Sequence, residues 1–326
     1  MLMSLLDYDD LPATQRVDEM EPGAYHAPVM PDEVAAFLRP GPGMLILDGT
    51  AGGGGHSEIF LRAGAEVVAL DQDAEAIEHC GLRLSEFGSR LHLWQSNFAR
   101  SGEVLDLLGL GPLQGAFLDL GVSSRQLDAG ERGFSFLRDG PLDMRMDRCG
   151  SMTAAVLVNT ADTAELARIF REYGEEPRAA QVAAHLARCR AEQPFRTTGE
   201  LAAAVSEVIF RTGSRHPATK VFQALRIAVN DELGALQRGL EVITERLASG
   251  GRLGVLTFHS LEDRIVKHFF RDRSVEWIDR PEWPAPRKNP ARAFRLLTPR
   301  PIDASGAEIQ TNPRARSAKL RVVEKL

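Results

Sequence analysis

A glycine-rich segment directly after a short apolar run is the feature that most constrains this chain. Residues 48–57 read Asp-Gly-Thr-Ala-Gly-Gly-Gly-Gly-His-Ser, and they follow the apolar residues 44–47. A strand that enters a glycine turn and then a helix lets bare backbone approach a ligand, and the first helical N–H groups point at an anionic part of it. Four adjacent glycines cost more backbone entropy than an ordinary turn requires. The segment therefore predicts a loop that binds a nucleotide-like cofactor.

The spacing of the glycines distinguishes this loop from other nucleotide-binding loops. A dinucleotide fingerprint needs G-x-G-x-x-G and a P-loop needs Gly-Lys-Ser/Thr, and residues 49–57 contain neither pattern. The order of Asp48, Thr50, Gly52 and Gly54 resembles instead the first motif of S-adenosylmethionine-dependent methyltransferases. The loop therefore favours S-adenosylmethionine over a nicotinamide cofactor or a nucleoside triphosphate.

Short apolar runs alternate with helical patterns in both halves of the chain. The predicted strands are residues 44–48, 66–71, 91–95, 116–120, 252–258, 294–297 and 318–323. Such alternation predicts an α/β fold with a parallel, doubly wound sheet, in which cofactors bind at the carboxyl ends of the strands. The second strand ends at Asp71, where a carboxylate can accept hydrogen bonds from both ribose hydroxyls of an adenosine.

The strand pattern is interrupted between about residues 150 and 216 by alanine-rich helical patterns. Two helix-start signals, Asp162-x-x-Glu165 and Thr197-x-x-Glu200, each precede an apolar helical face. We therefore predict an inserted helical subdomain. The predicted domains are a mobile N-terminal tail, 1–24, a sheet domain, 25–149 and 217–326, and the insertion, 150–216.

Cysteine usage and hydropathy indicate a cytoplasmic protein. Cys80, Cys149 and Cys189 lie far apart, which fits neither a disulfide framework nor a zinc site. The first 24 residues lack the apolar core of a signal peptide, and no apolar run approaches the length that spans a membrane. We expect a reducing compartment and no membrane partner.

The net charge of −6 is distributed unevenly along the chain. Residues 264–326 contain 15 Lys and Arg against 7 Asp and Glu, whereas the rest of the chain is acidic. If the chain binds a polyanion, we expect this segment to make the contact. A basic run alone, however, is more typical of a solvated surface. The densest parts of this segment are two groups of basic residues: Arg287, Lys288, Arg292, Arg295 and Arg300, and then Arg314, Arg316, Lys319 and Arg321.

A series of longer motifs extends from Tyr25 to Lys325. They occupy residues 26–30 with 33–34, 48–57, 118–124 with 126–128, 132–136, 139–147, 222–226, 258–264 and 316–321. In identity and order, these motifs resemble those of the bacterial small-subunit (16S) ribosomal RNA cytosine-N4 methyltransferase family. The resemblance implies a Rossmann-like class I methyltransferase sheet and S-adenosylmethionine as cofactor. It also implies that the substrate is a cytosine in the decoding region of the assembled small subunit.

The resemblance implies a set of cofactor-binding residues as well. In that family the Gly-Gly-His of the loop contacts the methionine part of the cofactor, the acid after the second strand binds the ribose, and three further residues complete the set. The corresponding residues here are Gly54, Gly55, His56, Asp71, Phe98, Asp119 and Gln126. An aromatic ring at Phe98 can lie against the adenine face.

The candidate catalytic residues follow from the chemistry of the cytosine amine. Its lone pair is delocalised into the ring, so the site must position the amine and accept a hydrogen bond from it, and no metal is required. Asp119, at the end of the fourth strand, and Ser123, just after it, are candidate acceptors. His259 follows a later strand and is a third candidate, although Ser260 with Asp263 also forms a plausible helix start.

Some questions stay open at the level of sequence. Phe134 and Phe136 are candidates for stacking on the substrate base, because the aromatic residue of DNA amino-methyltransferases is missing after the fourth strand. A methyltransferase of DNA or protein would share the cofactor loop, and a non-catalytic cofactor-binding assembly factor is a third interpretation. The sequence contains no indication of an oligomeric state.

Overall fold

The structure is a computed structural model that describes residues 28–210 and 216–326, and it contains two compact units. The first unit comprises residues 28–121 and 233–326, and the second comprises 122–210 and 216–232. The predicted N-terminal tail, 1–24, lies outside the described residues. Within the described ranges, no helix is both long and apolar enough to cross a bilayer.

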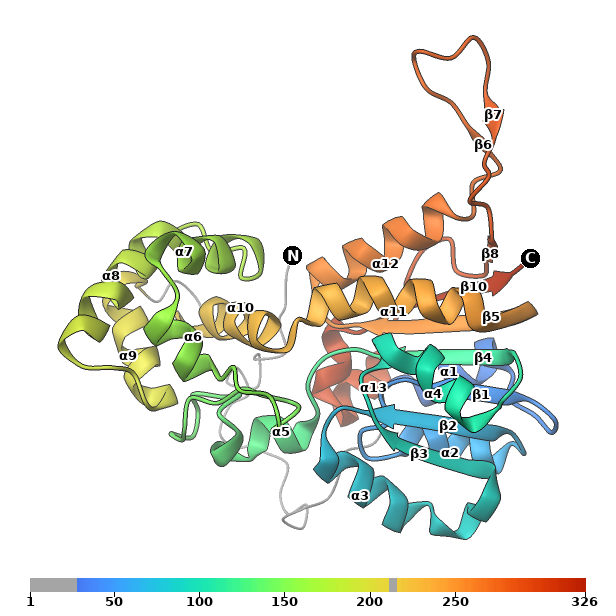
Figure 1. Ribbon diagram of the computed structural model, residues 1–326, viewed down its shortest axis with the longest axis horizontal. Helices are drawn as coiled ribbons and strands as arrows, with labels where there is room; N and C mark the ends of the chain where they lie inside the picture. Colours follow the sequence, from blue (N-terminus) through green and yellow to red (C-terminus); the bar gives the residue numbers. More distant parts are fainter. Residues whose placement is uncertain (1–27, 211–215) are drawn as a thin grey trace. The chain divides into compact units, whose positions relative to one another are not determined.

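The first unit is built around an eight-stranded sheet, counted over the described residues (Figure 1). Its strands are β1 (Leu45–Asp48), β2 (Glu66–Asp71), β3 (Leu91–Gln95), β4 (Leu113–Asp119), β5 (Leu247–Thr257), β8 (Phe294–Leu296), β9 (Ile302–Asp303) and β10 (Lys319–Lys325). The strand order is β3-β2-β1-β4-β5-β10-β8, with β9 also paired to β10. Strands β1 to β5 are parallel, and β10 runs antiparallel to β5 and β8. This confirms the predicted α/β, Rossmann-like class I sheet.

The order of the strands reverses at β1, which lies between β2 and β4. In open parallel sheets this switch point is where ligands bind, outside the carboxyl ends of the strands. Strands β2 and β3 have the predicted limits, whereas β5 begins at Leu247, five residues before the predicted start. The extra residues include Gly250 and Gly251, which interrupt the apolar pattern. Leu247 pairs with Leu113 of β4, and a register shift separates this pair from the pair of Arg252 with Gly115.

Helices cover both faces of the sheet. They are α1 (Pro31–Leu38), α2 (Gly55–Arg62) and α3 (Ala74–Arg83), then α4 (Ser101–Leu108), α11 (Glu232–Arg246), α12 (Ser260–Asp272) and α13 (Gly306–Thr311). One apolar cluster joins Leu47 and Leu118 of the sheet to buried residues of α4, α11 and α12. Phe117, which points to the opposite face, contacts Phe60 of α2 edge-on at 6.1 Å between ring centroids. Alternating side chains of each strand thus serve two separate helical layers.

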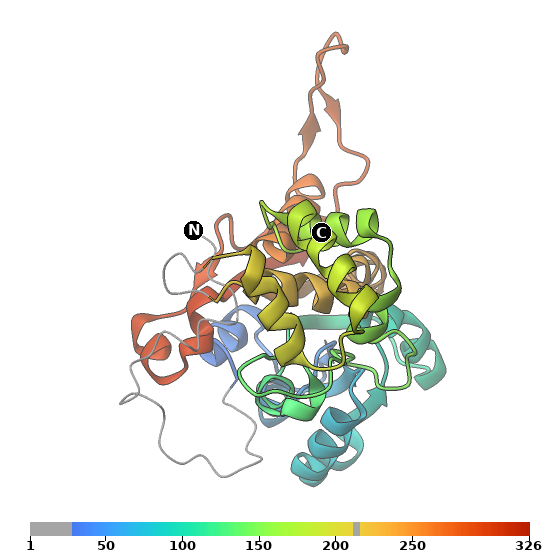
Figure 2. The same cartoon turned by 90° about the vertical axis from the view of Figure 1, so that its left-hand side faces the viewer.

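A thin hairpin extends from the end of α12. Strand β6 (Trp277–Ile278) pairs antiparallel with β7 (Arg287–Lys288), and the pair forms a sheet of its own. Both views show it projecting away from the α/β unit (Figures 1 and 2). We call residues 276–289 the hairpin arm.

The second unit is a helical bundle. Its helices are α5 (Ser124–Asp128), α6 (Ala154–Thr160), α7 (Thr163–Glu172), α8 (Ala179–Glu192), α9 (Thr198–Val208) and α10 (Thr219–Asn230). The predicted signals start two of them: the Asp162 side chain accepts from the Glu165 N–H at 2.7 Å, and Thr197 with Glu200 forms a complete capping box. The amphipathic patterns of α7 and α9 were therefore correctly identified.

This unit is larger than the predicted insertion, 150–216. Its core contains Phe134 and Leu142 from before that range and Phe222 and Leu225 from after it. The helical face of α10 was expected to belong with the sheet, but it packs on α7. The limits differ because periodicity identifies an apolar face without identifying the surface that buries it.

The irregular segment that precedes α6 is held by tight backbone packing. Arg132 is buried and donates hydrogen bonds to the carbonyls of Arg145 and Met146, at 3.1 and 3.3 Å. Gly133 has a φ of +71°, and a Cβ there would lie 2.2 Å from the Pro141 carbonyl oxygen. Only glycine fits this position.

We predict that Gly133→Ala lowers the free energy of unfolding by at least about 2 kcal/mol, because left-handed backbone and overpacking each cost roughly 1 kcal/mol or more. Gly150→Ala is the matched control, since a Cβ there meets nothing closer than 3.5 Å. Urea unfolding of both variants checks this. Equal midpoints would contradict the assignment of strain to Gly133.

Candidate cofactor and catalytic site

The loop after β1 is anchored by the carboxylate of Asp48. Asp48 is buried, its Oδ2 accepts a hydrogen bond from Ser57 Oγ at 2.6 Å, and its Oδ1 accepts from the Thr50 N–H at 3.2 Å. Burial raises the pKa of Asp48 to about 6. One side chain thereby fixes the start of the loop to the first turn of α2.

The glycines of the loop are required by backbone conformation and by close packing. Gly52 and Gly54 have φ values of +50° and +79°. A Cβ on Gly54 would lie 2.9 Å from Cys80 Sγ, and one on Gly55 would lie 3.1 Å from Pro28. Helix α2 begins at Gly55 and can approach its neighbours only without these side chains. The predicted cofactor contacts of Gly54 and Gly55 therefore fall at a helix N-terminus.

Asp71 lies at the carboxyl end of β2, beside the same loop. Its Oδ2 accepts a hydrogen bond from the Gly52 N–H at 2.9 Å, and its Oδ1 accepts from the Asp73 N–H at 2.9 Å. Two backbone donors thus fix the plane of the carboxylate, while each oxygen retains a second lone pair. Burial raises the pKa of Asp71 to about 6. The arrangement fits a ligand that offers two adjacent hydroxyl groups.

His56 lies in the first turn of α2 and is held from two sides. Its Nε2 is 2.9 Å from the Val29 carbonyl oxygen, and its ring packs on Phe117 with 4.5 Å between centroids. Burial lowers the pKa of His56 to about 4, so the ring is neutral, and the carbonyl contact assigns the proton to Nε2. The bare Nδ1 lies 3.7 Å from Asp119 Oδ2.

Asp119 ends β4, the strand next to β1. Its backbone N–H donates to Thr50 Oγ1 at 2.7 Å, which ties the end of β4 to the glycine loop. Burial raises the pKa of Asp119 to about 8, and the charges of Asp48 and Glu262 act in the same direction. The side chain is still 24% exposed, so solvent or a ligand can reach it. The site thus holds a carboxyl group poised near neutral pH.

The role of Thr50 was missed at the level of sequence. It was identified only as one position of the loop motif, whereas its hydroxyl connects two strand ends. The available signal was a hydroxyl residue placed two positions after a strand end, where backbone N–H groups need acceptors.

Phe98 is placed as a core residue close to the same edge. It starts a short 3₁₀ helix after β3 and is 9% exposed. A Cβ on Gly239 of α11 would lie 2.4 Å from Phe98 Cδ2, so one side of the ring faces the backbone of that helix. Packing alone accounts for this aromatic residue, and its contact with adenine stays a prediction.

The remaining candidates serve as helix caps. Ser123 and Gln126 belong to the second unit, where Ser123 Oγ accepts from the Gln126 N–H at 3.2 Å and Gln126 Oε1 accepts from the Ser123 N–H at 3.0 Å. His259 is the N-cap of α12, with its Nδ1 accepting from the Glu262 N–H at 3.4 Å. The expected cap of Ser260 with Asp263 is thus wrong by one residue, because the backbone of His259 is still extended.

The two candidate stacking aromatics lie within the second unit. Phe134 is buried in the helical core. Phe136 packs edge-on against Phe222 at 5.0 Å and close to His216 at 4.4 Å. Both rings already have aromatic or apolar partners, so a stacking role for Phe134 would require it to leave a packed core.

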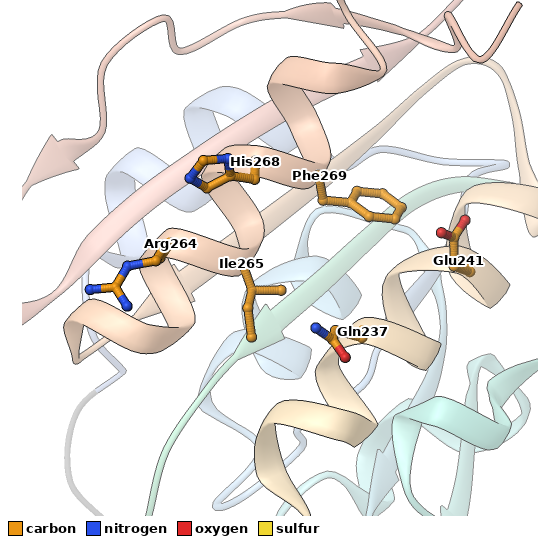
Figure 3. A pocket seen from close by; sticks show the side chains of 6 residues that line it. All are labelled: Gln237, Glu241, Arg264, Ile265, His268 and Phe269. Carbon is orange, nitrogen blue, oxygen red and sulfur yellow. The ribbon is translucent and has the colours of Figure 1, made fainter. Parts of the chain in front are cut away.

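A separate hollow lies between α11 and α12 (Figure 3). Its volume is about 420 Å³, and its lining side chains are Gln237, Glu241, Arg264, Ile265, His268 and Phe269. None of the predicted site residues lines it. The hollow is open to solvent, and the titratable groups with shifted pKa values make the strand ends the better candidate site.

Comparison with known proteins gives a consistent result. A model of the MraW methylase family matches residues 23–326. Ribosomal RNA small subunit methyltransferase H of Symbiobacterium thermophilum is 47% identical over 308 residues, which cover 93% of this chain and 97% of that protein. The protein of the same name from Anaeromyxobacter dehalogenans is 50% identical over 305 residues, which cover 92% and 98%.

Solved structures show weaker similarity. An rRNA methylase from Streptococcus thermophilus aligns with a TM-score of 0.40 and 13% identity, over 91% of this chain and 93% of that chain. SMU.1697c from Streptococcus mutans, in complex with SAH, aligns with a TM-score of 0.43 and 13% identity, over 91% of this chain and 98% of that chain.

We predict that Asp71→Ala weakens the binding of S-adenosylmethionine about 10- to 150-fold, because hydrogen bonds to a charged acceptor contribute about 1.5–3 kcal/mol. Asp73→Ala is the matched control: Asp73 caps α3 by accepting from the Glu75 N–H at 3.1 Å, so its loss should reduce stability and leave affinity intact. Isothermal titration calorimetry measures both. Equal affinities in the two variants would exclude Asp71 from the cofactor site.

We also predict that binding of S-adenosylmethionine near pH 7 releases a proton from Asp119. With a pKa of about 8 the free carboxyl group is mostly protonated at that pH, and a cationic sulfonium nearby favours its ionised form. Calorimetry in buffers of different ionisation enthalpy measures the release, which should disappear in Asp119→Asn. An identical buffer dependence in both proteins would show that another group titrates.

Proposed function

The chain belongs to the MraW methylase family, and we propose that it methylates the exocyclic N4 amine of a cytosine in small-subunit ribosomal RNA, with S-adenosylmethionine as methyl donor. The observation that carries the proposal is the convergence of the glycine loop, Asp71 and Asp119 at neighbouring strand ends. The substrate class is supported by full-length relatives named as ribosomal RNA small subunit methyltransferases. The choice of cytosine N4, in the decoding region of an assembled subunit, rests on the resemblance of the sequence motifs.

The residues at the strand ends fit S-adenosylmethionine group by group. The fixed carboxylate of Asp71 offers acceptors for the two ribose hydroxyls. The first turn of α2 offers backbone at Gly54 and Gly55 and the ring of His56 for the methionine part. Contact of Phe98 with the adenine stays a prediction from the sequence. When bound, the cofactor supplies an electrophilic methyl group on a cationic sulfur.

Asp119 is the residue that we propose to contact the N4 amine of the cytosine. Its carboxylate accepts a hydrogen bond from the N4 amine, holds the amine in line for attack and takes its proton as the new N–C bond forms. A pKa near neutrality suits this role, because the group is both available as a base and able to return the proton to solvent. The bare Nδ1 of His56 lies 3.7 Å from the carboxyl oxygen of Asp119, which is beyond hydrogen-bond length, so this contact does not hold the ionised carboxylate in place.

Ser123 and His259 take lesser roles in this proposal. Each side chain caps a helix close in sequence to a strand end, so each positions backbone in addition to any direct contact with the base. Gln126, the partner of Ser123, stays in the predicted cofactor set. The location in the cytoplasm also stays a prediction.

Two other interpretations are separated by product analysis. A DNA or protein methyltransferase would use the same loop and Asp71, and a non-catalytic assembly factor would bind the cofactor without forming product. Small subunits from a deletion strain, incubated with the purified chain and S-adenosylmethionine, should yield N4-methylcytidine in nucleoside mass spectrometry. Methyl transfer to DNA or protein alone, or no transfer, would reject the proposed activity.

We predict that Asp119→Asn lowers the single-turnover rate about 10²- to 10⁴-fold, the usual contribution of a general base, while the cofactor still binds. Asp303→Asn, an exposed carboxylate in β9, is the control and should retain the full rate. Quench-flow measurement with saturating cofactor tests both. A rate in Asp119→Asn within about threefold of the control would exclude Asp119 as the base.

A further inference from the structure

The hairpin arm has no apolar core, yet its base is firmly anchored. Almost every residue from 276 to 288 is exposed, and only Ile278 and Trp283 are partly covered. At the base, the buried Asn289 donates from Nδ2 to the carbonyls of Asp272 and Val275, at 2.7 and 2.9 Å, and from its backbone N–H to the Glu276 carbonyl. A segment that is fixed at its base but exposed along its length can offer its side chains to a binding partner.

The charged groups of the arm lie over aromatic rings. The guanidinium groups of Arg280 and Arg287 lie 5.0 and 4.8 Å from the Trp283 ring centroid, and Lys288 Nζ lies 5.9 Å from that of Trp277. Within the described residues, none of these three cations forms an ion pair with an acid. A guanidinium group that rests on an indole face keeps its N–H edge available for another acceptor.

The basic residues just after the arm differ in this respect. Arg292 pairs with Glu276 at 3.3 Å, and Arg295 pairs with Glu324 at 2.5 Å. The dense basic group of the sequence therefore divides into cations that are neutralised by the protein and cations that are held on tryptophan rings. Only the second kind can bind a phosphate without first breaking an ion pair.

The tip of the arm is stiffened by its sequence. Residues 279–286 contain three prolines, Pro281, Pro284 and Pro286, which fix the backbone φ and remove donors. A stiff tip loses little conformational entropy on binding. Trp277 is 51% exposed at the opposite end of the hairpin and offers a free aromatic surface.

We propose that the hairpin arm binds single-stranded RNA of the substrate, with Arg280, Arg287 and Lys288 contacting phosphates and Trp277 stacking on an unpaired base. Aromatic side chains interleaved with cations are the usual means by which proteins hold single strands. The acids of the arm, Glu276, Asp279 and Glu282, balance its cations in number, so the contact depends on placement more than on net charge. This inference rests on the proposed function, which supplies the RNA.

The test compares the affinity of three variants for unmethylated small subunits over a series of salt concentrations. Replacing Arg280, Arg287 and Lys288 together by Gln should lower the magnitude of the salt slope by about 2, since each phosphate contact of a single strand contributes about 0.7. Trp277→Ala should weaken binding about 5- to 150-fold and leave the slope unchanged. The control, Arg292→Gln with Arg295→Gln, should leave both quantities unchanged.

Two further measurements distinguish a failure of this proposal from a failure of the proposed function. Cofactor affinity, measured on each variant, should equal that of the parent, because the arm lies outside the glycine loop. Photo-crosslinking of the parent to subunits should attach the 276–289 peptide to RNA. A triple variant whose slope equals that of the control, or a peptide attached only to ribosomal protein, would overturn the proposal. N4-methylcytidine formed by the parent in the same subunits would leave the proposed function standing in either case.

Discussion

The buried carboxylate of Asp48 is the constraint on which the rest of the site depends. It joins the start of the glycine loop to Ser57 of α2, so the loop can adopt only conformations that keep the helix N-terminus beside the end of β1. Burial is the main cause that raises the pKa values of Asp71 and Asp119, which belong to the two neighbouring strands, and the charge of Asp48 adds to the effect. A single buried acid therefore fixes the shape of the loop and contributes to the electrostatics of the strand ends.

Three carboxyl groups gathered at one edge would repel one another if all were ionised. The structure limits this by giving Asp48 and Asp71 two hydrogen-bond donors each, which favours their charged forms. Within the described residues, no hydrogen-bond donor reaches the carboxyl group of Asp119. Asp119 accordingly has the highest pKa of the three. The group with the fewest donors is therefore the one whose charge can change most readily near pH 7, as the role proposed for Asp119 requires.

The sequence analysis was most accurate where local chemistry decides structure. The limits of β2 and β3, the capping box at Thr197 and the position of the glycine loop all follow from short-range patterns of turn formers, caps and apolar alternation. The sequence analysis was least accurate where two neighbouring residues can fill the same structural role. Ser260 and His259 are both able to cap α12, and the extended backbone of His259 decided between them.

The sequence by itself determined that this chain forms a methyltransferase-type sheet with a cofactor loop after its first strand, because glycine spacing and strand-end acids are properties of neighbouring residues. Only the tertiary structure decided which helical faces share a core, which basic residues are neutralised by acids, and that Thr50 ties β1 to β4. Those outcomes depend on residues far apart in the chain: Arg295 meets Glu324, and Asp119 meets Thr50. No local pattern encodes a partner at that distance, since periodicity specifies that a face is buried and leaves open what buries it.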